Sequence, residues 1–163
     1  MSDAETVLAD SPAGHKDELR LWLRMLTCTT LIETEIRRRL RAEFDTTLPR
    51  FDLLAQLFRT PDGLTLGELS RRMMVSNGNL TGLSGRLEAE GLVERSTLAT
   101  DRRATTLRLT ARGRRDFAVQ SAAHEGWIAE LLGGVSATDR AALFRLLART
   151  KTSARAAIEE QAP

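Results

Sequence analysis

Two short helices stand directly before a pair of strands in residues 65–115, and this order constrains the fold more than any other feature of the chain. Thr65 is a predicted N-cap for the first helix. The apolar residues of that helix recur at spacings of three and four, at Leu66, Leu69 and Met73. After a short break, Ser76 caps a second helix that runs to about Glu90. Gly91 is predicted to end it, because glycine tolerates the left-handed conformation at a helix end.

The strands follow at once. Residues 92–96 and 105–109 are predicted strands on either side of a polar turn, residues 97–104, and Thr110 is predicted to open another helix. The sequence therefore predicts a mainly α protein with a small β-hairpin wing, the layout of a winged helix-turn-helix.

The second helix of this pair carries unusually small side chains on one face. Opposite its apolar stripe, Leu80, Leu83 and Leu87, a rotation of 100° per residue places Gly78, Thr81, Gly82, Gly85 and Ala89. Each glycine inside a helix costs roughly 1 kcal/mol relative to alanine, and that cost suits a helix whose backbone must approach a groove closely. The alternatives are that the glycine-rich start is partly loop, or that this face packs against protein.

Polar groups suited to DNA accompany the small face and the predicted wing. A guanidinium held on a β-ribbon fits a narrow minor groove, and a neighbouring carboxylate can fix its direction. The side chains of the helix can bond base edges or phosphates. The predicted DNA-binding residues are Ser76, Asn77, Gly78, Asn79, Thr81, Gly82, Ser84, Gly85 and Arg86 on the helix, and Asp101, Arg102 and Arg103 at the wing tip.

With its helix-turn-helix, LTLGELSRRMMVSNGNLTGLSGRLEAEGLVER, followed by DRR and then LRLTARGRRDF, the chain resembles the MarR family of bacterial transcriptional regulators. The resemblance is best over residues 62–117. It implies a symmetric homodimer that binds a palindromic operator in double-stranded DNA, usually a repressor that a ligand releases. It also implies that Arg102 or Arg103 reaches the minor groove. The helix after Ser76 is richer in Gly and Asn than the family pattern, so base preference does not carry over.

The rest of the chain is expected to form a scaffold. We expect a flexible tail over residues 1–15, an N-terminal dimerisation helix over 16–46, the winged helix-turn-helix domain over 47–110, and C-terminal dimerisation helices over 111–163. The terminal helices carry apolar stripes that are far apart in sequence. Such stripes are most simply buried against each other and against a second copy of the chain. A dimer would also place two recognition helices about 34 Å apart, one turn of duplex.

Composition excludes several classes of protein. Residues 65–115 hold ten arginines and five acidic residues, a local charge of +5 within a chain of net charge +2, which favours phosphate binding by this segment. No run of 18 apolar residues and no secretory leader occur in the sequence, and the single cysteine fits a cytoplasmic location. The sequence shows no catalytic, metal or phosphate-loop pattern, so we expect neither an enzyme nor a cofactor.

A small-molecule effector is a further expectation, because proteins that resemble this one often bind an aromatic acid, and some respond to an aromatic acyl-CoA thioester. The candidate ligand-binding residues are Trp22, Met25, Thr29, Arg50, Phe51 and Leu54, which would give an apolar wall and one cation for a carboxylate. Two alternatives stay open. Cys28 could make the chain a redox-sensing repressor, or the chain could be a protein-interaction module without specific DNA binding.

Overall fold

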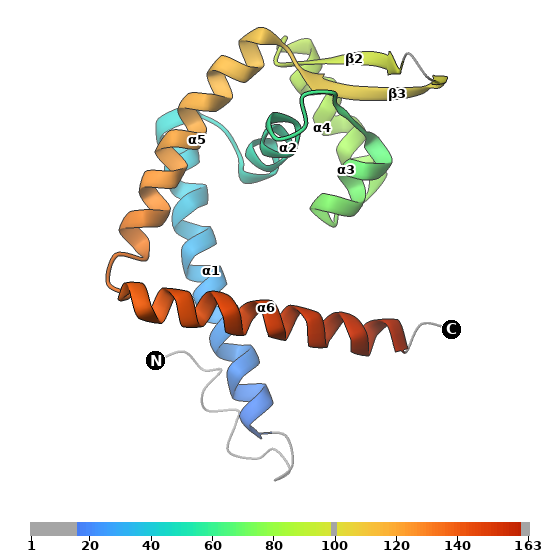
Figure 1. Cartoon of the computed structure of the whole chain (residues 1–163). Coiled ribbons are helices and arrows are strands. Elements are labelled where there is room, and N and C mark those ends of the chain that lie inside the picture. The colour runs from blue at the N-terminus through green and yellow to red at the C-terminus, as the bar shows by residue number, and fades with distance from the viewer. Residues whose placement is uncertain (1–15, 99–100, 161–163) are drawn as a thin grey trace. The chain divides into compact units, whose positions relative to one another are not determined.

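The computed structural model describes residues 16–98 and 101–160, and over these residues the chain is mostly helical with one small sheet (Figure 1). The predicted tail, residues 1–15, lies outside the described residues. Side chains are described outside residues 97–105. The elements are α1 (Lys16–Phe44), α2 (Leu48–Phe58), β1 (Leu64–Thr65), α3 (Leu66–Met73), α4 (Asn77–Ala89), β2 (Val93–Leu98), β3 (Asp101–Leu109), α5 (Ala111–Leu131) and α6 (Ala137–Glu160). The prediction of a mainly α fold with a β-hairpin is confirmed.

The chain divides into two compact units. Residues 1–125 form the first, which contains α1 to α4, the sheet and most of α5. Residues 126–163 form the second, which contains the last residues of α5 and all of α6.

Side-chain caps begin both helices of the helix-turn-helix, as predicted. The Thr65 hydroxyl accepts a hydrogen bond from the backbone N–H of Glu68 at 3.2 Å, and the Glu68 carboxylate accepts one from the Thr65 N–H at 2.8 Å. This reciprocal capping box satisfies two donors that the first turn of α3 leaves open. At the start of α4, the Ser76 hydroxyl accepts a longer bond, 3.5 Å, from the Asn79 N–H.

The turn between α3 and α4 depends on a methionine in an unfavourable conformation. Met74 has φ 56° and ψ 39°, the left-handed region that normally favours glycine. Its side chain is 88% exposed, so little packing offsets the strain. The turn is held by Ser70, whose hydroxyl donates to the Val75 carbonyl at 2.6 Å and whose carbonyl accepts from the Met74 and Val75 N–H groups.

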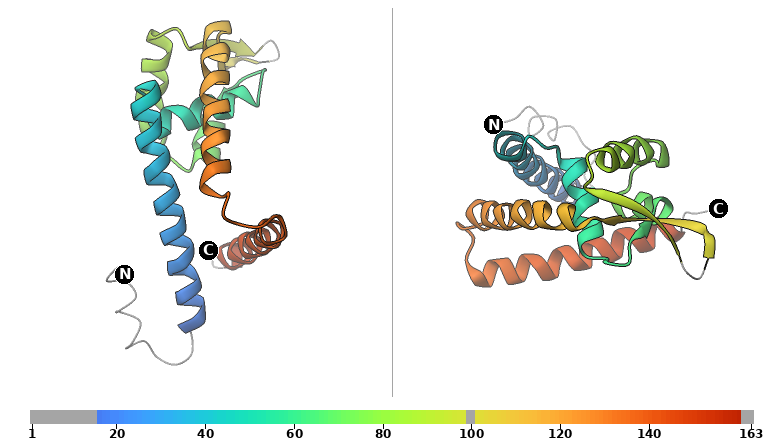
Figure 2. Two further views of the ribbon diagram at one scale, coloured as in Figure 1. Left: turned by 90° about the vertical axis from the view of Figure 1, so that its left-hand side faces the viewer. Right: turned by 90° about the horizontal axis from the view of Figure 1, so that it is seen from above.

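The hairpin is longer than predicted, and it belongs to a three-stranded antiparallel sheet of order β1-β3-β2. The sequence analysis missed β1, which pairs Leu64 with Leu107. The predicted turn, residues 97–104, is also too long, because the ladder continues to the pair Leu98 and Asp101. Thr97 and Asp101 pair through their backbones, which a pattern of side-chain polarity does not reveal. The hairpin projects from the helices of its unit as a twisted ribbon (Figures 1 and 2).

The register of the hairpin contains an irregularity at the wing arginines. Thr97 pairs with Thr105 and the next residue, Leu98, pairs with Asp101. Residues 102–104 of β3 therefore lie between two pairs that are adjacent on β2. Extra residues on one strand bend it and change the direction of what they carry. Arg102 and Arg103 thus stand at a bulge near the turn rather than in the turn itself.

The core of the first unit fixes α4 on one side. Leu80 and Leu87 are fully buried and Leu83 is nearly so, as the predicted stripe requires. They share the unit with buried leucines of α2 and the sheet, and with Phe117 of α5, whose ring lies 5.1 Å from the Phe51 ring. The first turn of α5 passes so close to the entry of β2 that a Cβ on Gly113 would lie 1.9 Å from the Leu92 carbonyl oxygen.

We predict that Met74→Gly stabilises the protein. The exchange removes the strain of a left-handed non-glycine residue, about 1 kcal/mol, and sacrifices almost no buried surface because the side chain is exposed. Urea unfolding should show a higher midpoint with an unchanged slope. Met74→Ala is the matched control, since alanine keeps the Cβ that causes the strain. Equal or lower stability of the glycine variant would contradict the assigned turn geometry.

Candidate nucleic-acid interface

The face of α4 opposite the core is open to solvent. Eight of the nine predicted DNA-binding residues of the helix-turn-helix are exposed, namely Ser76, Asn77, Gly78, Asn79, Thr81, Gly82, Gly85 and Arg86. They come from the N-cap and the first three turns of the helix. The Thr81 hydroxyl donates to the Asn77 carbonyl at 2.9 Å, one turn earlier, so it lies close to the helix backbone. The structure therefore gathers the predicted small and polar groups on one surface of a helix.

Packing within the described part of the chain does not explain the glycines of this face. At Gly78, Gly82 and Gly85, no described atom lies within 4 Å of the position that a Cβ would take. Their φ angles are negative, so a side chain would be allowed there. At Gly113, by contrast, a Cβ would collide with the backbone of Leu92. Of the alternatives raised by the sequence, packing of these glycines against the described residues of their own unit is thereby excluded. So is a loop at the start, because α4 is helical from Asn77.

Ser84 corrects the predicted set. Its side chain is fully buried, and its hydroxyl donates to the Thr81 carbonyl at 3.1 Å. It also lies 3.5 Å from a guanidinium nitrogen of Arg95, which donates to it. A hydroxyl that is buried and already bonded cannot reach a base edge. The helical projection placed Ser84 at the margin of the polar face, and the sheet residue Arg95 covers that margin.

Arg95 is a residue that the sequence analysis missed. From β2 it reaches α4 twice, through the bond to Ser84 and through an ion pair with Glu88 at 3.0 Å. It therefore joins the hairpin to the helix. Residues 88 and 95 are separated by a helix end and a strand start, so no local spacing rule indicated the pair. The acidic residues at the end of the predicted DNA-binding helix were the available signal.

Arg50 was predicted to pair with a ligand carboxylate, and the structure gives it another partner. Its two terminal nitrogens donate to the two carboxylate oxygens of Glu90, the C-cap residue of α4, one of them at 2.7 Å. This hydrogen bonding raises the pKa of Arg50 and holds the pKa of Glu90 below its ordinary value. Arg50 is therefore engaged in binding α4, and its role as a free cation for a ligand is not supported.

The other predicted ligand residues lie on α1 and α2. Phe51 and Leu54 are buried core residues of α2. Trp22 is 54% exposed and lies 22 residues before the end of α1, about 33 Å along the helix axis. Met25 and Thr29 lie on α1 between Trp22 and the C-terminal end of the helix. The Thr29 hydroxyl donates to the Met25 carbonyl at 2.9 Å.

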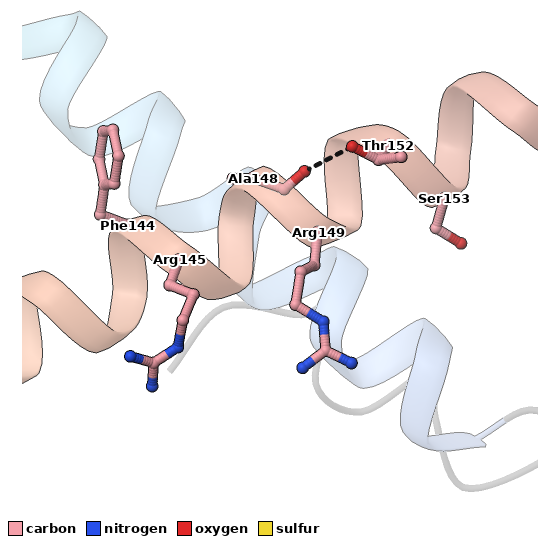
Figure 3. A pocket seen from close by; sticks show the side chains of 6 residues that line it. All are labelled: Phe144, Arg145, Ala148, Arg149, Thr152 and Ser153. Carbon is pink, nitrogen blue, oxygen red and sulfur yellow. Dashed lines mark hydrogen bonds between the residues drawn. The ribbon is translucent and has the colours of Figure 1, made fainter.

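A hollow on α6 is a poor substitute for the predicted ligand pocket. It is lined by Phe144, Arg145, Ala148, Arg149, Thr152 and Ser153, which all belong to one helix. Figure 3 shows the two guanidinium groups extending on the same side of α6, while the Phe144 ring points to the other. Ligand sites bury most of a ligand's surface between converging walls, and one helix face does not provide such walls.

The described residues offer little other chemistry. Cys28 is a free, exposed thiol in the middle of α1. Over residues 16–98 and 101–160, no three or more His, Cys, Asp or Glu side chains gather as metal ligands would. In that same part of the chain, no helix combines the length and the apolar character needed to cross a membrane.

Comparison with known proteins agrees with this geometry. A family model described as "MarR family" matches residues 46–105. The transcriptional activatory protein BadR of Rhodopseudomonas palustris is 33% identical over 144 residues, which cover 85% of this chain and 82% of BadR. An uncharacterized HTH-type transcriptional regulator of Bacillus subtilis, YdgJ, is 30% identical over 64% of this chain and 63% of its own.

Solved structures share the fold. A MarR family transcriptional regulator from Silicibacter pomeroyi is 32% identical with a TM-score of 0.68, over 93% of this chain and 100% of that chain. Streptococcus pneumoniae FabT, solved in complex with DNA, has a TM-score of 0.71 at 21% identity, over 83% of this chain and 96% of that chain. At that identity the likeness to FabT shows the winged helix-turn-helix fold alone.

We predict that Gly82→Ala combined with Gly85→Ala stabilises the protein and weakens specific DNA binding. Each methyl enters open space in the free protein, and alanine favours the helix by about 1 kcal/mol per site. Against DNA the same methyls prevent close approach, so affinity should fall by roughly tenfold. Unfolding and fluorescence anisotropy on one preparation measure both effects.

The matched control for these variants is Gly126→Ala. Gly126 lies inside the C-terminal half of α5 with similarly open surroundings. It should give the same gain in stability and leave DNA affinity as it is. A double α4 variant that binds DNA as well as the original protein would show that the glycine face is not seated on DNA.

Proposed function

The chain belongs to the MarR family of DNA-binding transcriptional regulators and is not an enzyme, and we propose that it binds a symmetric operator through α4 and the β2–β3 hairpin. The observation that carries this proposal is the exposed glycine face of α4, which nothing described in the chain requires. A helix that must lie against bases and phosphates accounts for it. FabT, which shares the fold, is solved in complex with DNA, and this supports DNA binding as the function of the fold.

A homodimer is the second part of the proposal. Large apolar side chains are exposed on α1, namely Leu19, Leu21, Trp22, Leu26 and Leu31. The same is true of α6, at Leu143, Phe144, Leu146, Leu147 and Ile158. Apolar surfaces of this extent mark interfaces in proteins. A second copy would bury them and would present two α4 helices to the two halves of a palindromic operator in the cytoplasm.

The wing is proposed to contact the adjacent minor groove. The bulge at residues 102–104 places Arg102 and Arg103 near the turn of a projecting ribbon. Arginine is favoured in narrow minor grooves because their negative potential is enhanced. Asp101 precedes the two arginines and pairs through its backbone with Leu98.

We predict that Arg102→Ala plus Arg103→Ala weakens binding and makes it less sensitive to salt. The duplex for this test is the one most enriched when the intact protein selects from random DNA, and we expect it to be palindromic and bound by two chains. The slope of log K against log salt should become shallower by about 0.9 for each phosphate that the variant no longer neutralises. Anisotropy across a salt series, with a scrambled duplex for comparison, measures the slope.

The control removes the same charge elsewhere, by Lys151→Ala plus Arg155→Ala at the exposed end of α6. That variant should keep the original slope. If selection enriches no duplex, or if intact protein binds selected and scrambled DNA equally, the chain is instead a protein-interaction module. If the wing variant keeps the full slope, these arginines do not contact phosphate.

An effector and the sign of regulation complete the proposal. We expect a repressor that an aromatic acid or its acyl-CoA thioester releases, although the name of the relative BadR, an activatory protein, favours activation as the second candidate. To separate the two, a reporter placed behind the selected duplex should be silenced by the intact protein, whereas enhancement would establish an activator.

We predict that small aromatic acids or their acyl-CoA thioesters release the bound duplex, and that Cys28→Ser does not alter this release. Release needs an effector that binds the DNA-free conformation better, by about 5.5 kcal/mol for a full switch. Titration of the preformed complex measures it. Release by peroxide that disappears in the serine variant would establish the redox-sensing alternative.

A further inference from the structure

Two arginines from outside the helix-turn-helix bind the C-terminal end of α4. They are Arg50 of α2 and Arg112 of α5. We propose that Arg50 is a positioning residue for DNA recognition: its ion pair with Glu90 fixes the end of α4 and so sets the direction in which the glycine face meets DNA. The inference rests on the proposed function of α4 and names a residue that touches no DNA.

The geometry of the pair is specific. Arg50 and Glu90 are 40 residues apart, and both terminal nitrogens of the guanidinium meet both carboxylate oxygens. A two-pronged contact of this kind fixes orientation as well as distance, because both groups are planar. The Arg50 side chain is only 22% exposed, against 44% for Glu90, so the arginine is the anchored partner.

The backbone beyond Glu90 is fixed as well. The Arg112 guanidinium donates to the Glu90 carbonyl at 3.3 Å. The Thr110 hydroxyl donates to the Gly91 carbonyl at 2.8 Å, and Gly91 turns the chain with φ 71°. The helix end is therefore tied to α2 by a side chain and to the start of α5 by its carbonyls.

Helix stability does not explain the choice of residues. A carboxylate at a helix C-terminus faces the negative end of the helix dipole, and a cation near a helix N-terminus faces the positive end. Glu90 is the C-cap of α4, and Arg50 lies in the first turn of α2. Each residue is therefore at the end of its own helix where its charge is unfavourable. The benefit of the ion pair is that it links α2 to α4.

A small change in the direction of α4 at its Glu90 end produces a large displacement at its Ser76 end. The 13 residues of α4 span about 20 Å, so a tilt of about 10° about the Glu90 end moves the Ser76 end by roughly 3 Å. A hydrogen bond to a base edge does not tolerate a shift of that size. Binding to phosphates in general is much less dependent on position. Loss of the pair should therefore reduce discrimination between sequences more than it reduces binding to any DNA.

Glu90→Gln separates positioning from simple electrostatics. It removes a negative charge from a DNA-binding unit, and on charge alone it should tighten binding to all DNA. Positioning predicts the opposite for the selected duplex: affinity falls about fivefold, in line with a partly exposed ion pair. Affinity for a scrambled duplex should stay the same or rise. The salt slope should not change, because the same phosphates remain neutralised.

A charge swap and a matched control complete the experiment. Arg50→Glu combined with Glu90→Arg restores an ion pair and places each charge at the helix end that the dipole favours. It should recover the ratio of selected to scrambled affinity that Glu90→Gln loses. Glu35→Gln is the control, since Glu35 accepts hydrogen bonds from Arg38 and Arg39 within α1 and has no part in holding α4. Its ratio should equal that of the original protein.

The measurement is anisotropy on full-length protein, at a temperature where circular dichroism shows each variant to be folded. A ratio of selected to scrambled affinity that is unchanged in Glu90→Gln, or a swap that recovers nothing, overturns the proposal. Failure of the original protein to prefer any duplex would instead refute the proposed function, so the two failures are distinct.

Discussion

The burial of Leu80, Leu83 and Leu87 is the interaction on which the rest of the structure depends. With three glycines in 13 residues, α4 is a poor helix on its own, and host–guest values put the cost near 3 kcal/mol in total. An isolated helix of this length would not form in water. Packing of the leucine stripe supplies the missing stability, and it leaves the opposite face free to carry almost no side chain. The same helix therefore carries core residues on one face and the proposed DNA-binding surface on the other.

The charge of this unit serves two purposes. Residues 65–115 are strongly basic, yet several of their arginines bind within the protein: Arg95 to Glu88, Arg108 to Glu94 and Arg112 to the Glu90 carbonyl. Their net charge still attracts phosphate at long range. Their hydrogen bonds, however, orient α4 and the hairpin. The number of basic residues thus indicates how strongly this unit attracts phosphate at long range, but it does not indicate how many arginines are available to contact DNA.

Local chemistry allowed much of this fold to be predicted from the sequence. The N-caps Thr65 and Ser76, the left-handed Gly91 and the leucine stripe of α4 follow from short-range rules, and the structure confirms them. What failed depends on partners distant in the chain. The strand β1 exists only through β3, Ser84 is covered by Arg95, and Arg50 is taken by Glu90, 40 residues away. No periodicity within a segment carries that information.

The central claim, that the glycine face of α4 lies against DNA, is tested most directly by backbone amide signals in a ¹H–¹⁵N spectrum as the selected duplex is added. The account predicts that Gly78, Gly82 and Gly85 shift strongly. Gly113, which is packed against the Leu92 carbonyl, should change little. Strong shifts confined to other surfaces, with the three α4 glycines unmoved, would contradict the account.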